Sequence, residues 1–145
     1  MLINLMLIGK WCNSHHLSFV SKIIYAIQFF LFNSSLPHSA IIGKGSKFAY
    51  GGIGCVIHKR ARVGKNCTFG QNITIGGRSK HVDVPIIGDN VYIGAGARVL
   101  GPINIGDNVI IAPNAVVISD VPPSTIVGGI PAKVIKSDID PSNFI

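Results

Sequence analysis

The sequence contains no glutamate, and six aspartates are its only acidic residues. Thirteen lysines and arginines outweigh them and give a formal net charge of +7. This excess of positive charge favours an anionic partner. Charged residues as a whole are scarce, at 13% of the chain, whereas hydrophobic residues reach 48%. At 145 residues the chain has the length of one domain.

Cysteines and long apolar runs are also scarce. The three cysteines, at positions 12, 55 and 67, are odd in number and follow no pattern. They give no support for an oxidising compartment, so we expect a cytoplasmic protein. The apolar run over residues 23–32 is too short for a membrane span, which needs about 20 residues. No basic segment precedes residues 2–8 and no A-x-A site follows them, so we expect no signal peptide.

What the sequence does contain is a six-residue repeat from position 57 to position 117. An aliphatic or aromatic residue recurs every six positions, and only His81 breaks the series. The series is Ile57, Val63, Phe69, Ile75, Ile87, Ile93, Val99, Ile105, Ile111 and Val117. A glycine or alanine usually follows each of these residues, and asparagine often stands three positions after them.

The period of six indicates short strands, because it is a multiple of two and a poor match to 3.6. One apolar side chain in six cannot bury itself alone, so successive units must stack. Glycine and asparagine suit corners that need a positive φ or a close approach of the backbone. The sequence therefore predicts an all-β solenoid with parallel strands and a narrow apolar core.

The first 35 residues lack the repeat and predict a short helical cap. Polar residues recur at helical spacing, namely Ser18, Ser21, Lys22, Tyr25 and Gln28. They leave a wide apolar face of Phe19, Ile23, Ile24, Ile27, Phe30 and Leu31. This pattern is typical of an amphipathic helix. We expect the helix to cover the open end of the solenoid. The alternative is peripheral contact of residues 1–33 with the inner face of a membrane.

Three segments resemble the hexapeptide-repeat acyltransferases, and in particular the serine acetyltransferase branch and its relatives in surface-polysaccharide pathways. They are VIHKRARVGKNCTFGQNITIGG, VPIIGDNVYIGAGARVLGPINIGDNVIIAPNAVV and DVPPSTIVGGIPAKVIK. The resemblance implies a left-handed β-helix over residues 36–136, between a cap over 1–35 and a tail over 137–145. It also implies acetyl-CoA as a co-substrate, with no permanently bound cofactor.

The resemblance implies an O-acetyltransferase that acts on a sugar hydroxyl in polysaccharide or glycoconjugate synthesis. The nearest alternative is serine O-acetylation, but the serine enzymes carry a large helical N-terminal domain and a serine-contacting carboxylate. The residues before the repeat contain no acid. N-acetylation of an amino sugar and a scaffold without catalytic activity are further alternatives. A metalloenzyme is another, yet no third histidine on the repeats accompanies His58 and His81, so we expect no metal.

Three departures from the repeat mark the candidate site. The first is the insert AYGGIGCV between Phe48 and Ile57. The second is His58, which stands where most repeats have glycine or alanine. The third is GGRSKHVDVP, residues 76–85, which we expect to form an outward polar loop. Loops on a rigid scaffold are where function usually resides.

Acyl transfer to a hydroxyl needs a base for the hydroxyl proton and N–H donors for the developing oxyanion. Histidine is the natural base, since it ionises near neutral pH. The relatives place their catalytic histidine in the segment that aligns with residues 49–54, where this chain has Tyr50 and two glycines instead. We assign the base to His58, and His81 is the other candidate. Asp83, a backbone carbonyl or a neighbouring subunit must then hold the second ring nitrogen.

The remaining site residues divide into three sets. We expect the oxyanion donors at Gly76 and Gly77, where no side chain blocks the backbone. We expect the acceptor to contact Tyr50, Arg78, His81 and Asp83. The resemblance implies an acetyl-CoA cleft along one edge of the solenoid, formed by Gly77, Ala95 and Ala112, with Lys133 and Lys136 near the CoA phosphates.

The resemblance also implies a homotrimer with active sites between adjacent subunits. Acetyl-CoA is one anionic partner that suits the net charge, and a nucleotide sugar or a membrane surface is another. No recognition motif supports nucleic acid, so we expect none. The basic residues that flank His58 could contact a phosphate-bearing acceptor or form a solvated face; they are Lys59, Arg60, Arg62 and Lys65.

Overall fold

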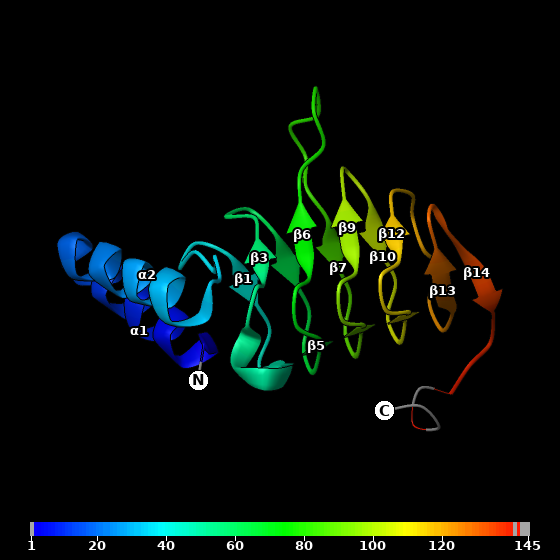
Figure 1. Ribbon diagram of the computed structural model, residues 1–145, viewed down its shortest axis with the longest axis horizontal. Helices are drawn as coiled ribbons and strands as arrows, with labels where there is room; N and C mark the ends of the chain where they lie inside the picture. The colour runs from blue at the N-terminus through cyan, green and yellow to red at the C-terminus, as the bar shows by residue number, and fades with distance from the viewer. Residues whose placement is uncertain (1, 141, 143–145) are drawn as a thin grey trace.

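The computed structural model describes residues 2–140 and 142, which form two helices followed by a parallel β-solenoid (Figure 1). The helices are α1 (Leu2–Ser14) and α2 (Ser18–Phe32). The first two coils contain β1 (Ile41–Ile42), β2 (Lys47–Phe48), β3 (Val56–Ile57), β4 (Arg62–Val63), β5 (Thr68–Phe69) and β6 (Thr74–Gly76). The next two contain β7 (Ile86–Ile87), β8 (Tyr92–Ile93), β9 (Arg98–Leu100), β10 (Asn104–Ile105), β11 (Ile110–Ile111) and β12 (Val116–Val117).

Three sheets form the faces of the solenoid, and each coil contributes one strand to each face. The strand orders are β1-β4-β7-β10, β2-β5-β8-β11-β13-β14 and β3-β6-β9-β12. All strand pairs are parallel except the last, in which β13 (Ile126–Gly129) and β14 (Ala132–Lys136) form an antiparallel hairpin. Ile57 pairs with Ile75 and Ile75 with Val99. The second of these steps is one hexapeptide longer, and the extra residues form the loop between β6 and β7.

The repeat directs its apolar residues inward, as the sequence predicts. All ten apolar residues of the series are at most 4% exposed. Cys67 is fully buried beside them, and this burial raises the pKa of its thiol because the thiolate is poorly solvated. The predicted asparagine corners are also confirmed. Their φ values lie between 55° and 59°, for Asn66, Asn72, Asn90, Asn108 and Asn114.

The two helices cover the N-terminal end of the solenoid, as expected, but with a different orientation. Leu2 and Met6 of α1 join the core of the first coil, together with Phe32 of α2. Helix α1 was not predicted as a separate element. The wide apolar face predicted for α2 is mostly exposed and does not form the covering surface. The polar residues Ser21 and Gln28 of α2 are each 2% exposed, whereas Phe19, Phe30 and Leu31 are among its most exposed residues.

The C-terminal end differs from a further hexapeptide coil. The β13–β14 hairpin closes the six-stranded sheet, so the GGIPAKVIK segment forms an antiparallel pair instead of a repeat. Beyond β14, Ile139 is buried and its N–H donates to the Ser124 carbonyl at 3.0 Å. The part of the expected tail at positions 141 and 143–145 lies outside the described residues.

Candidate active site

Two corners of the solenoid carry the residues singled out from the sequence. The first, here the His58 corner, follows β3, β6, β9 and β12, and its residues are His58, Gly76, Leu100 and Ile118. The second, here the Ala112 corner, follows β2, β5, β8, β11 and β13, and its residues are Ala49, Gly70, Gly94, Ala112 and Gly128. Ala95 lies one residue further along the second corner.

The structure brings His58 and Gly76 onto neighbouring coils of the same corner. The pairing of Ile57 with Ile75 places the next residue of each strand side by side, and strands in a sheet lie about 4.8 Å apart. The His58 N–H donates to the Ile75 carbonyl at 2.8 Å, which fixes the backbone of His58. Its half-buried side chain therefore projects from a rigid corner.

The neighbour of the His58 ring is a hydrogen-bond donor, whereas the predicted mechanism requires an acceptor next to the second ring nitrogen. Its Nδ1 accepts the Arg60 N–H at 3.2 Å. A neutral imidazole in this arrangement carries its hydrogen on Nε2. To take a proton at Nε2, the ring must give up this bond and place the hydrogen on Nδ1. No carboxylate of the described residues hydrogen-bonds to this ring.

Gly77 is better placed than Gly76 as an oxyanion donor. Gly76 is the last residue of β6, and its carbonyl accepts the Gly101 N–H at 3.0 Å. Gly77 follows the strand and is exposed, and no residue of the described chain accepts its N–H. An unengaged N–H beside a histidine is one half of the machinery for acyl transfer.

The loop after Gly77 extends outward, as the sequence predicts. Figure 1 shows it projecting well beyond the end of β6. Arg78, His81 and Asp83 are all exposed on it. The His81 N–H donates to the Arg78 carbonyl at 3.0 Å, and Arg60 Nη2 donates to the Val82 carbonyl. The second bond ties the tip of the loop back to the segment that follows His58.

A basic pocket lies below this loop, on the face formed by β1, β4 and β7. Its volume is about 480 Å³, and its lining residues are Ser39, Ile41, Lys59, Arg60, Arg62, Asp83, Val84 and Ile86. In the described chain, no hydrogen bond or ion pair engages the side chains of Lys59, Arg62 and Asp83. The pocket can therefore hold an anionic group through Lys59 and Arg62, beside Arg60, which is bonded to Val82.

The sequence anticipated only part of this pocket. Asp83 belongs to the predicted acceptor set, and the three cations to the cluster beside His58. Ser39, Ile41 and Ile86 were missed. The available signal was register, because Ile41, Arg62 and Ile86 occupy the same outward position on successive coils. Neither His58 nor His81 lines the pocket.

The Ala112 corner gathers most of the residues expected to hold acetyl-CoA. Ala95 and Ala112 are both half-buried there. Lys133 joins them, since it pairs with Gly128 at the same corner. Lys136 pairs with Ile126 at the other end of the hairpin. Tyr50 also follows this corner, on the turn η1 (Ala49–Gly52), where it has a φ of 49° and is 76% exposed.

The residues expected to form one acetyl-CoA cleft along a single edge lie at two different corners. Gly77 lies at the His58 corner, whereas Ala95 and Ala112 lie at the other. Tyr50 is likewise separated from the loop that carries Arg78, His81 and Asp83, and Figure 1 shows η1 and this loop at opposite ends of the strands. The structure thus places the two sets at different corners of one chain.

Within residues 2–140 and 142, no three side chains of histidine, cysteine or aspartate lie close enough together to hold a metal ion.

The coils, the repeat and a family match define the class of protein. The family described as bacterial transferase hexapeptide (six repeats) matches residues 85–119. The repeat and the fold are therefore those of hexapeptide-repeat proteins, and the resemblance found in the sequence is confirmed. No curated protein matches the chain significantly.

Solved structures of serine acetyltransferases are similar to this chain. That of Neisseria gonorrhoeae is 31% identical, with a TM-score of 0.88 over 96% of this chain and 55% of its own. Its complex with serine is 32% identical, with a TM-score of 0.84 over 91% and 54%. The Brucella abortus strain S19 enzyme in complex with coenzyme A is 28% identical, with a TM-score of 0.87 over 93% and 54%. The chain spans about half the length of these relatives.

Proposed function

We propose that this protein is an acetyl-CoA-dependent acetyltransferase that acts on a hydroxyl group. The observation that carries the proposal is the similarity, over more than nine-tenths of the chain, to a serine acetyltransferase solved with coenzyme A. The arrangement at the His58 corner supports it, because a histidine and an unengaged N–H lie on neighbouring coils.

In the proposed reaction, His58 takes the hydroxyl proton as the acceptor oxygen attacks the thioester carbonyl carbon. The Gly77 N–H stabilises the negative charge that develops on the carbonyl oxygen. The carbon–sulfur bond then breaks, and the sulfur leaves as the CoA thiol with the proton that His58 held. The acetyl group remains on the acceptor oxygen as an ester.

We propose that acetyl-CoA lies between the Ala112 corner of one chain and the His58 corner of the next. In this arrangement Ala95 and Ala112 border the pantetheine arm, and Lys133 at the same corner contacts the CoA phosphates, with Lys136 further along β14. This arrangement joins the two sets of residues that one chain keeps apart. A ring of three chains would repeat the same contact with closed symmetry, which gives the homotrimer.

Serine is the acceptor that the comparisons favour, because the similar structures are serine acetyltransferases and one contains serine. The basic pocket offers cations for the serine carboxylate and Asp83 for its ammonium group. A sugar hydroxyl in polysaccharide or glycoconjugate synthesis is the second candidate. Three cations line the pocket and Asp83 is its only carboxylate. This excess of positive charge supports the second candidate, since it suits an acceptor that carries phosphate or another anionic group.

An acceptor screen that follows the release of free CoA thiol tests the proposal. Serine, sugar phosphates, nucleotide sugars and amino sugars are each mixed with acetyl-CoA and protein. Release that depends on serine supports the first acceptor, and release that depends only on a saccharide supports the second. An amino sugar that yields an amide indicates N-acetylation. Absence of release with every acceptor supports a scaffold without catalytic activity.

A further inference from the structure

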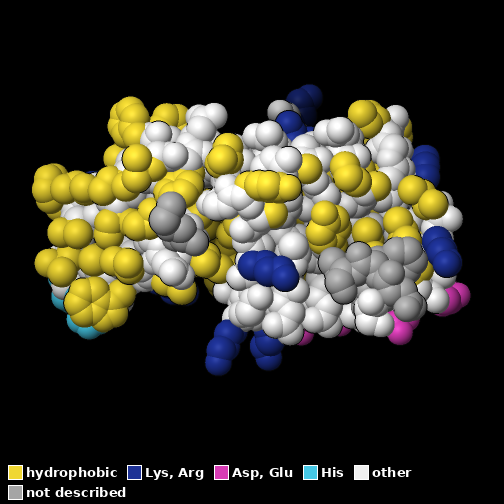
Figure 2. Space-filling view, turned by 60° about the horizontal axis from the view of Figure 1, so that its bottom comes forward, with side chains coloured by type: hydrophobic (Ala, Val, Ile, Leu, Met, Phe, Trp, Pro, Cys, Tyr) yellow, Lys and Arg dark blue, Asp and Glu magenta, His cyan; other side chains and the backbone are white. Residues whose placement is uncertain are grey.

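The helical end of the molecule exposes its apolar side to solvent. Figure 2 shows hydrophobic side chains covering much of the surface over α1 and α2. On α2, Phe30 is 83% exposed and Phe19 is 74% exposed, and Trp11 of α1 is more than half exposed. We call this surface the helical patch; its members are Leu7, Ile8, Trp11, Leu17, Phe19, Val20, Ile23, Ile27, Phe29, Phe30 and Leu31. Contiguous apolar surface of this kind marks an interaction site.

The orientation of α2 is fixed by polar contacts on its inner side. Ser21 Oγ lies 3.1 Å from His38 Nδ1, and Tyr25 Oη lies 2.6 Å from Ser35 Oγ. The side-chain amide of Gln28 lies between the Leu36 carbonyl and the Met6 N–H, at 3.0 and 3.2 Å. Turning the helix to bury its apolar side would break these bonds and leave polar groups unpaired. The helical patch is therefore a built outer surface.

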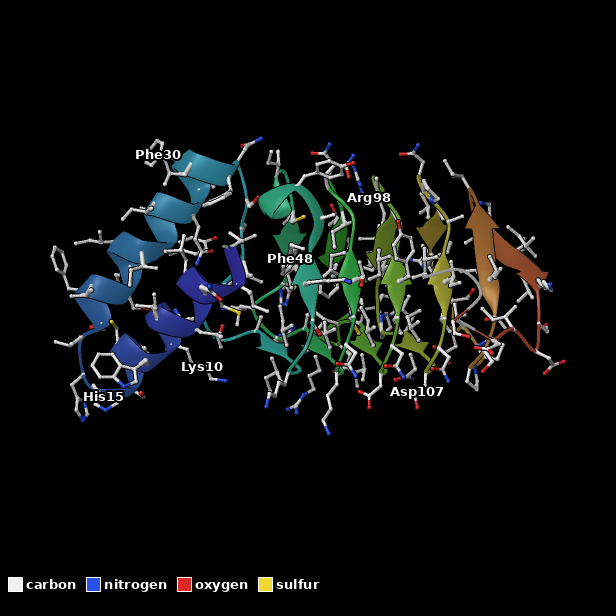
Figure 3. The ribbon with its side chains drawn as sticks, turned by 90° about the horizontal axis from the view of Figure 1, so that it is seen from below. Lys10, His15, Phe30, Phe48, Arg98 and Asp107 are labelled. Carbon is white, nitrogen blue, oxygen red and sulfur yellow. The ribbon has the colours of Figure 1, made fainter. Side chains whose placement is uncertain are left out.

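The charge around the helical patch has one sign. Residues 1–82 hold ten of the 13 lysines and arginines and none of the six aspartates. Lys10 and Lys22 are exposed on the two helices themselves, and Figure 3 shows Lys10 on α1. The first acidic residue along the chain is Asp83, on the loop after β6. The helices thus carry two exposed lysines and no acidic side chain, and the coils next to them add further cations.

From these observations we propose that the helical patch docks on the surface of a membrane that contains anionic lipids. Aromatic and aliphatic side chains enter the boundary between head groups and acyl chains, while lysines contact the head groups. Helices of 13 and 15 residues extend about 20 Å each, short of the roughly 30 Å hydrocarbon layer. No helix in the described chain is long and apolar enough to cross a membrane, so the pair lies along the surface.

The same charge argues against a second copy as the occupant. Two helical ends placed together would bring cations against cations, with no acidic side chain in residues 1–82 to offset them. Like charges in contact disfavour such an interface. A lipid surface offers both missing components, namely negative charge and an apolar layer, in one partner.

Vesicle sedimentation tests the proposal and needs neither acetyl-CoA nor an acceptor, so its outcome is independent of the proposed function. The protein is mixed with vesicles of phosphatidylcholine alone, or of two parts phosphatidylcholine to one part phosphatidylglycerol. We expect it to sediment with the second kind and to remain in solution with the first. The substitutions Phe30→Ser and Leu31→Ser together should weaken binding roughly tenfold or more, and Lys10→Gln with Lys22→Gln should weaken it several-fold.

Ile130→Ser is the matched control, because Ile130 is 75% exposed at the far end of the molecule, on the turn between β13 and β14. It should leave vesicle binding unchanged. The proposal is overturned if the wild-type protein stays in solution with the anionic vesicles. It is also overturned if Ile130→Ser weakens binding as much as the helical substitutions. A fall in oligomer mass caused by Phe30→Ser and Leu31→Ser, without vesicle binding by the wild type, would instead assign the patch to a second copy.

Discussion

At the scale of single residues, asparagine makes the corners of this solenoid. A φ near 55° is unfavourable for residues that have a β-carbon, and asparagine tolerates this conformation better than most other side chains do. Its amide also bonds to the next coil. Asn66 Nδ2 donates to Asn90 Oδ1 at 3.4 Å, and Asn90 Nδ2 donates to Asn108 Oδ1 at 3.1 Å. The recurring asparagine in the sequence thus has two physical causes at once.

Ala112 provides a test of the acetyl-CoA cleft at the residue scale. It is half-buried at a corner and absent from the apolar core, so a larger side chain can point outward. We expect Ala112→Tyr to raise the Michaelis constant for acetyl-CoA sharply, because the ring occupies the space proposed for pantetheine. The Michaelis constant for the acceptor should not change. Steady-state kinetics and a thermal melt measure both effects.

Ala115→Tyr is the control for Ala112→Tyr, since Ala115 is fully buried in the core of the same coil. Overpacking there costs about 1–3 kcal/mol and should lower the melting temperature. If Ala112→Tyr destabilises the fold as Ala115→Tyr does, Ala112 faces the core. If it leaves both the fold and the acetyl-CoA kinetics intact, the cleft lies at another corner.

At the scale of elements, the cap is attached to the solenoid by a close contact between α1 and η1. A β-carbon placed on Gly52 would lie 2.5 Å from Leu2 Cδ2, and Gly52 has a φ of 86°. Glycine is therefore required there both by conformation and by space. The insert between β2 and β3, which the sequence showed as a break in the repeat, thus forms the surface on which the first helix packs.

Gly52→Ala should loosen the cap. The positive φ costs alanine roughly 1–2 kcal/mol, and displacement of Leu2 adds about 1–3 kcal/mol. Gly51→Ala is the matched control, because its φ of 72° carries the first cost but its nearest side-chain atom lies at 3.6 Å. Denaturant unfolding measures both variants. Equal losses of stability would show that the contact with Leu2 contributes nothing.

The elements also show what the sequence could and could not predict. Period six identified the strands and their buried faces, because each repeat unit depends on its neighbours in the same way. Periodicity could not orient α2, since its inner side is chosen by partners distant in sequence, such as His38 and Ser35. Nor could it separate Gly77 from Ala112, because the corner to which a residue belongs depends on counting through the irregular insert and loop.

At the scale of the whole molecule, the two separated sets of site residues predict assembly. A single chain presents His58 and Gly77 at one corner and Ala95 and Ala112 at another. We expect a trimer, in which each cleft joins unlike corners of two chains. Light scattering with size-exclusion chromatography should give three times the chain mass. A monomer at micromolar concentration would contradict both the assembly and the shared cleft.

The most direct test of the central claim is the turnover of His58→Ala in the CoA-release assay, with His81→Ala as its matched control. The account predicts that His58→Ala lowers turnover by about 100-fold or more, as for a positioned base, and leaves the melting temperature unchanged. His81→Ala should mainly raise the Michaelis constant for the acceptor. Full turnover by His58→Ala, with turnover lost in His81→Ala, would contradict the assignment of the base and move the chemistry to the loop.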